Sequence, residues 1–331
     1  MKRILNVLLV LMLAFVTAFN FAACVDNSDN DTTKKGLSYK KIDGVYTIYK
    51  YVAEDGVDTL DIGAILSEAG ITNVTIKKGA FDGNSSIKNL IISNAVTEIQ
   101  AGAFRNMTAL ENLEVPFIGR TAKADAFDGE TAKAEDKAVD GARTIAHFFG
   151  TEEYTEGKSV TVNYGSGTAS CYMPYTLTKV TVNGAAGYKI PMYAFNGAPI
   201  KTVVIKEGTA VIGENAFANC ASLTSVELPA SIKTIYKNAF NTATILKNVT
   251  FADGASEVAI KDKAFEGCAS ISYIGKKVSE LPANTIDLTV VSEIGFKALD
   301  FGNENKTYTV VAGTIAAENL TSALGDTKIA Q

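Results

Sequence analysis

The chain has 331 residues, of which 47% are hydrophobic and 20% are charged. That composition is too apolar for an intrinsically disordered chain. The 31 basic and 36 acidic residues give a formal net charge of −5, which argues against a polybasic nucleic-acid-binding protein. His147 is the only histidine, so any catalytic or metal site that requires two histidines is excluded.

The chain begins with the features of an export signal. Lys2 and Arg3 precede an apolar stretch over residues 7–19 that only Thr17 interrupts. Such a stretch is shorter than the roughly 20 residues of a membrane-spanning helix and is typical of the hydrophobic part of a signal peptide. We therefore expect residues 1–23 to be a signal peptide.

A lipid-attachment motif follows. The segment Phe21-Ala22-Ala23-Cys24 resembles a bacterial lipobox, in which cleavage occurs just before a cysteine that is then lipidated, although Phe21 replaces the usual leucine. The resemblance implies a lipid anchor at Cys24, with plain secretion or a spanning anchor as alternatives. Because Val25–Gly36 has little apolar content, we expect residues 24–36 to form the lipidated cysteine and a flexible tether.

The rest of the chain repeats with a period of about 23 residues. Ala-Phe pairs place phenylalanine at positions 81, 104, 195, 217, 240 and 265. Short segments that alternate apolar and polar residues recur with the same period, as in Leu223–Pro229, and this alternation favours strands. The longer gap between Phe104 and Phe195 indicates an insertion.

These patterns predict a β-dominated solenoid with one stacked parallel sheet and one insertion between repeats. A single coil cannot bury its apolar face, whereas stacked coils bury each other's faces. The phenylalanines should form a ladder through the interior, with Cys220 and Cys268 as buried small apolar residues at matching positions. A disulfide or a reactive thiol is the alternative for these two cysteines. The third remaining cysteine, Cys171, makes the number odd, so a full disulfide framework is not implied.

A family resemblance supports this architecture. Residues 216–235 read AFANCASLTSVELPASIKTI, which is similar to the BspA-type leucine-rich repeat unit, AF-x-x-C-x-x-L-x-x-V-x-L-P-x-S-V-x-x-I-G. The resemblance covers about residues 71–300 and implies a leucine-rich-repeat solenoid that acts in adhesion or host-protein contact. The expected segments are an N-terminal cap (37–70), repeats (71–116), the insertion (117–176), repeats (177–300) and a C-terminal cap (301–331).

Within the insertion, residues 121–142 are rich in Ala, Lys, Asp and Glu. We interpret them as an exposed loop or a short helix. Phe127, although it lies 23 residues after Phe104, is not expected to belong to a true repeat.

The sequence provides no catalytic set. His147 has apolar neighbours and is interpreted as a packed or partly exposed side chain. The acidic residues Glu152, Glu153 and Glu156 are interpreted as a solvated surface, with a hydrolase that uses two carboxylates as the alternative. Neither HExxH nor CxxC occurs, so we expect no metal, no cofactor and no enzymatic activity.

Binding is expected on one of two surfaces. If the strand register is right, alternate residues face the open side of the sheet, where they either bind a partner or are simply solvated. The competing surface is the insertion, where tyrosines would bind carbohydrate. The expected partner is a protein or a glycan, and no nucleic acid is expected to bind. We expect the protein to be exported and held at the cell surface, with its lipid anchor in the membrane. The candidates are Asn73, Thr75, Asn89, Asn112, Glu114, Lys179, Thr202, Ser225, Glu227, Asn248 and Thr250 on the sheet, and Tyr154, Tyr164 and Tyr172 in the insertion.

Overall fold

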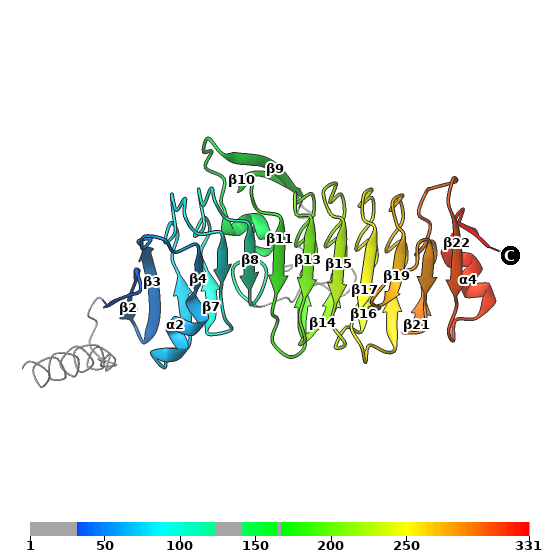
Figure 1. Ribbon diagram of the computed structural model, residues 1–331, viewed down its shortest axis with the longest axis horizontal. Helices are drawn as coiled ribbons and strands as arrows, with labels where there is room; N and C mark the ends of the chain where they lie inside the picture. Colours follow the sequence, from blue (N-terminus) through cyan, green and yellow to red (C-terminus); the bar gives the residue numbers. More distant parts are fainter. Residues whose placement is uncertain (1–31, 123–140, 164–166, 331) are drawn as a thin grey trace, which may run out of the picture.

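The computed structural model describes residues 32–122, 141–163 and 167–330. They form an elongated stack of coils in which the chain advances from one end to the other in sequence order (Figure 1). The predicted solenoid is therefore confirmed, whereas the signal peptide and Cys24 lie outside the described residues.

One long parallel sheet extends along the whole stack. Val203, Val226 and Val249 are partners in register on adjacent strands and are almost fully buried, so they form one row of the core. This sheet confirms the predicted stacked sheet. In spatial order its eleven strands are β4 (Thr59–Asp61), β6 (Asn89–Ile91), β8 (Asn112–Val115), β11 (Lys179–Val182), β13 (Thr202–Ile205), β15 (Ser225–Leu228), β17 (Asn248–Phe251), β19 (Tyr273–Lys276), β20 (Thr285–Asp287), β22 (Thr307–Val311) and β23 (Lys328–Ile329).

Two shorter sheets, which the sequence analysis did not anticipate, pack onto the same core. Apart from β1, β2 and β3 of the N-terminal region, their strands come from the second half of each repeat, where buried residues such as Ile212, Ile235 and Ile260 align in register. The N-terminal sheet contains β1 (Thr32–Lys34), β2 (Leu37–Ile42), β3 (Val45–Tyr51), β5 (Val74–Ile76) and β7 (Val96–Ile99), and the C-terminal sheet contains β12 (Tyr188–Ile190), β14 (Thr209–Ile212), β16 (Thr234–Ile235), β18 (Val258–Ile260) and β21 (Val291–Ile294).

The phenylalanine ladder is confirmed in the C-terminal half. The ring centroids of Phe195, Phe217, Phe240 and Phe265 are successively 4.7, 4.9 and 4.9 Å apart, with the rings within 12° of parallel. Backbone hydrogen bonds also connect the coils at these turns. The N–H of Phe217, for example, donates to the carbonyl of Ala239 in the next coil at 2.7 Å. The alanine that precedes each phenylalanine is buried, which keeps adjacent turns close.

Cys220 and Cys268 are buried, as predicted, and these two and the buried Cys171 are free thiols. The thiol of Cys220 donates to the carbonyl of Phe195 at 2.9 Å, and the thiol of Cys268 donates to the carbonyl of Phe240 at 3.0 Å. Burial raises the pKa of Cys171 and of Cys220 to about 12 and also raises the pKa of Cys268. These thiols therefore act as small core groups and not as nucleophiles.

We expect this burial to prevent alkylation in the native protein. With iodoacetamide at pH 8, Cys171, Cys220 and Cys268 should stay unmodified until denaturant is added, because a raised pKa leaves almost no thiolate at that pH. Intact-mass spectrometry would count the labels. Rapid native labelling of Cys220 or Cys268 would contradict the packing described here.

The insertion leaves the long sheet unbroken. Strand β8 pairs directly with β11, although residues 116–178 separate them in sequence. The insertion includes the short 3₁₀ turns η1 (Gly141–Arg143) and η2 (Ile145–Phe148), and an antiparallel hairpin of β9 (Gly157–Asn163) and β10 (Thr168–Pro174). This hairpin lies beside the stack (Figure 1, upper edge). Most of the predicted loop or helix over 121–142 falls within residues 123–140, outside the described residues.

Turn η2 takes the place of an Ala-Phe turn. The N–H of Phe104 donates to the carbonyl of Phe148 at 2.9 Å, and the N–H of Ile145 donates to the carbonyl of Ala194 at 2.8 Å. Phe148 and Phe149 are fully buried. The insertion is thus built into the stack between its two halves.

The N-terminal cap continues the coils. Strand β3 pairs with β5, and β4 adds one strand to the long sheet. Helix α2 (Ile62–Glu68) follows, with the Asp61 carboxylate accepting a hydrogen bond from the N–H of Ala64 at 2.8 Å. Because capping by Asp satisfies a free helix N–H, it fixes where the helix begins.

Three residues of the predicted tether belong to the folded part of the chain. Residues 32–34, which were assigned to it, form β1 and pair with β2. The pairing is supported by an ion pair between Lys34 and Glu68 with an N–O distance of 3.2 Å.

The C-terminal cap contains β22, helix α4 (Ala317–Leu324) and β23. Tyr308 is fully buried against Phe301, and its hydroxyl donates to the carbonyl of Ile271 at 2.8 Å.

Candidate functional site

The outward-facing residues of the long sheet form two rows. Nine of the eleven predicted face residues belong to these rows, because the strands are aligned in register. The first row contains Asn89, Asn112, Lys179, Thr202, Ser225 and Asn248, and the second contains Glu114, Thr181, Val204, Glu227 and Thr250.

Asn73 and Thr75 were wrongly placed on this face. Strand β5, which contains Thr75 and directly follows Asn73, belongs to the N-terminal short sheet, where Thr75 is the partner of Glu98. The spacing carries a signal that would have identified this. Ile76 lies five residues before Phe81, just as Ile235 lies five residues before Phe240, and this is the second strand of the unit.

Side chains in the first row bond to one another. The Asn112 amide donates to the Asn89 carbonyl oxygen at 2.7 Å, and the Asn89 amide donates to Thr59 at 2.9 Å. Ser225 donates to Thr202 at 3.3 Å. These polar groups therefore support the sheet, which reduces their capacity to bind a partner.

The second row carries two ion pairs that cross strands. Lys206 lies 2.8 Å from Glu114, across β11, and Lys277 lies 2.7 Å from Glu227, across β17. The intervening residue of β17, Thr250, is only 6% exposed. Thr250 was expected to face solvent, and this expectation is wrong because the long lysine side chain reaches over it.

A groove with a volume of about 570 Å³ runs along this row. Its lining extends from Asn94, which follows β6, to Lys277, which follows β19. The six steps between neighbouring strands, at about 4.8 Å each, give the groove a length of about 29 Å. An extended peptide of about nine residues has the same length. Glu227, Lys206 and Lys277 line it, so both charge signs are present.

The insertion tyrosines do not form an exposed aromatic surface. The Tyr154 hydroxyl donates to the backbone carbonyl of Tyr172 at 3.4 Å, and burial raises the pKa of Tyr154. The Tyr172 side chain is half-buried, and Tyr164 lies outside the described residues. Tyr175 is the exposed one, at 65%.

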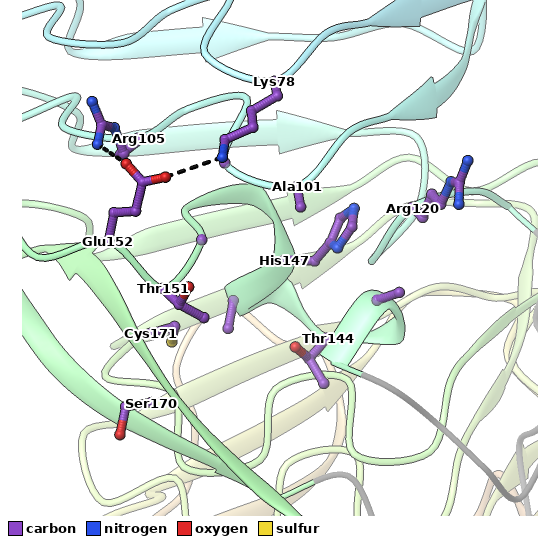
Figure 2. A pocket seen from close by; sticks show the side chains of 14 residues that line it. Lys78, Ala101, Arg105, Arg120, Thr144, His147, Thr151, Glu152, Ser170 and Cys171 are labelled. Carbon is purple, nitrogen blue, oxygen red and sulfur yellow. Dashed lines mark hydrogen bonds and ion pairs between the residues drawn. The ribbon is translucent and has the colours of Figure 1, made fainter.

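The predicted acidic cluster is tied to the repeats through Glu152. Its carboxylate pairs with Lys78 at 3.0 Å and with Arg105 (Figure 2). The hydrogen bond from Lys78 and the charge of Arg105 hold the pKa of Glu152 below its usual value. A glycosidase acid needs a raised pKa, so Glu152 does not fit that role.

His147 is held by the repeats. Its Nε2 lies 3.0 Å from the carbonyl oxygen of Ile99, and its own carbonyl accepts the N–H of Gly102. Within the described ranges, no three His, Cys, Asp or Glu side chains gather in a way that would hold a metal ion. No helix in that part of the chain is long and apolar enough to cross a membrane.

The stacked coils and the outward rows of one parallel sheet define a β-solenoid repeat protein. Six copies of the BspA type leucine rich repeat region match residues 67–134 and 168–298, and the chain belongs to this family. No curated protein matches the chain.

Two solved structures are similar along most of their length. A leucine rich cell surface protein from Faecalibacterium prausnitzii is 15% identical, with 90% of this chain and 98% of that chain covered and a TM-score of 0.34. A leucine-rich repeat protein from Bacteroides ovatus is 15% identical, with 91% and 99% covered and a TM-score of 0.25.

Proposed function

We propose that this protein is a non-enzymatic, lipid-anchored surface protein that binds another protein through the groove on its long sheet. Adhesion to a host or matrix protein is the role that fits this family best. The observation that carries the proposal is the groove itself, which reaches from Asn94 to Lys277 and is also lined by Lys206 and Glu227.

Both the shape and the charge of the groove favour a polypeptide partner. A surface about 29 Å long suits an extended segment, since the strand spacing sets the length at about 4.8 Å per coil. The ion pairs of both lysines lie at the surface, since the side chain of Lys206 is 49% exposed and that of Lys277 is 59% exposed. Surface ion pairs contribute little stability, so a partner with alternating charges can exchange with them.

The tyrosine-based carbohydrate alternative loses its support. Tyr154 is turned inward onto the backbone of Tyr172, so its ring is not available as a platform for a sugar. The lipid anchor rests on the resemblance of residues 21–24 to a lipobox.

A charge-reversal variant tests the groove. Lys206→Glu with Lys277→Glu should weaken binding to a protein identified on a matrix-protein array by about tenfold or more, because both cations are replaced by repelling charges. Biolayer interferometry at two salt concentrations would measure the affinity. The matched control is Lys261→Glu, whose pair with Glu293 links the C-terminal short sheet instead.

The two variants separate the proposed face from general charge effects. Equal weakening by Lys261→Glu would mean that the net charge of the protein, and not the groove, governs binding. Unchanged affinity of the double variant would overturn the proposal, as would the absence of saturable binding to any protein on the array.

A further inference from the structure

Arginine is used at one place in the folded chain. The sequence has four arginines, of which Arg3 lies in the expected signal peptide. Arg105 and Arg120 line a cavity of about 400 Å³, and Arg143 lies between two further lining residues, Ala142 and Thr144. His147, the only histidine of the sequence, lines it as well.

This concentration indicates a specific chemical role. Elsewhere the folded chain uses lysine for its positive charges. Arginine differs from lysine because its planar guanidinium binds a carboxylate or a similar oxyanion through two parallel hydrogen bonds. Two of the three arginines of the described residues line this one cavity, which suits it to bind an anionic group.

The cavity exists because the insertion packs on the turns of the first repeats. One wall comes from η2 and the residues after it, and the other comes from the turns that follow β5 and β7. Gly150 and Gly102 meet closely, since a Cβ atom at Gly150 would lie 3.2 Å from the Cα of Gly102. Three alanines and two glycines are among the lining residues, and Figure 2 shows Lys78, Arg105 and Glu152 close together with Arg120 apart from them.

Glu152 already shows how a carboxylate is held at this cavity. It pairs with both Lys78 and Arg105, while Arg105 also pairs with Asp82 and Arg120 pairs with Glu98. Lys78 is 66% and Glu152 is 51% exposed. Because exposed ion pairs contribute at most about 1 kcal/mol, a ligand carboxylate can displace Glu152 from its cations.

We propose that this cavity binds a carboxylate-bearing sugar unit of an acidic glycan. The carboxylate is held by Arg105 and Lys78 in competition with Glu152, and Thr151 and Ser170 contribute hydroxyl groups to the same cavity for the sugar. A volume of about 400 Å³ lies in the range of small-molecule sites, roughly 300–1,000 Å³. This favours a whole sugar ring over a single acidic side chain. The site is separate from the groove of the proposed function.

The test compares two oligosaccharides that differ in one group. A glucuronate-terminated oligosaccharide should bind, and its glucose-terminated counterpart should not. Arg105→Gln should weaken binding about tenfold, and Lys78→Gln should weaken it as well, because these two cations hold the carboxylate. Glu152→Gln should tighten binding about fivefold, because the competing internal carboxylate is lost. Lys261→Gln, on the C-terminal short sheet and outside both the cavity and the groove, is the matched control and should have no effect.

Isothermal titration calorimetry would measure the affinities, and far-UV circular dichroism would check that each variant is folded. Should Arg105→Gln fail to fold, Glu152→Gln and Lys78→Gln still decide the question. Equal binding of the neutral oligosaccharide, unchanged or weaker binding by Glu152→Gln, or binding of a glutamate-rich peptide in place of the glycan would each overturn the proposal.

Discussion

Replacing Phe240 by alanine is expected to lower the free energy of unfolding by about 3–5 kcal/mol. Phe240 is fully buried and stacks on Phe217 and Phe265, each at a centroid distance of 4.9 Å. Truncation removes two aromatic contacts and leaves a cavity between coils that the rigid neighbouring backbones cannot fill. Urea denaturation followed by circular dichroism would measure the loss.

The control for this prediction is Phe296→Ala. Phe296 is 52% exposed and lies outside the ladder, so its truncation should change the free energy of unfolding by less than about 0.5 kcal/mol. If Phe240→Ala were as mild as this control, the ladder would not be the main support of the stack.

Replacing Cys24 by serine is expected to release the protein from the membrane fraction almost completely. Each buried methylene of an acyl chain contributes about 0.8 kcal/mol, and a single chain holds a protein only reversibly. Lipidation of this type usually attaches two or three chains, so its loss removes the whole anchor. Fractionation of the cells, with mass analysis of the mature N-terminus, would measure the result.

Cys171→Ser is the matched control, because the Cys171 thiol is buried and cannot carry a lipid in the folded protein. Membrane retention of Cys24→Ser would indicate a spanning anchor instead. A soluble wild-type protein would indicate plain secretion with cleavage near Cys24.

The repeated part of the fold could be predicted because its causes are local in the sequence. Each coil presents the same short strand and the same Ala-Phe turn, so the period alone predicts the register of Val203, Val226 and Val249. The buried positions of Cys220 and Cys268 follow from their matching contexts in two coils.

The failures occurred where two parts of the repeat look alike. The strand containing Thr75 has the same alternation as those of the long sheet, and only its distance from Phe81 distinguishes it. The burial of Thr250 could not be predicted, because it depends on a lysine that reaches across a strand to pair with Glu227.

The cavity beside the insertion could not be predicted from the sequence, for a different reason. Its cations and the carboxylate that they hold lie far apart in the chain, with Lys78 and Glu152 separated by 74 positions. Periodicity carries no information about such contacts, since η2 joins the stack through backbone bonds to Phe104 and Ala194 that no repeat motif marks.

Direct pairing of β8 with β11 also bears on how such proteins diversify. Because a long excursion leaves the sheet register intact, gene duplication or deletion of one whole coil would change the length of the molecule by about 4.8 Å and preserve both ends. Unequal recombination between coils can therefore produce variants that differ in the length of the solenoid. Insertions such as the hairpin can change independently, because the sheet that carries them stays the same.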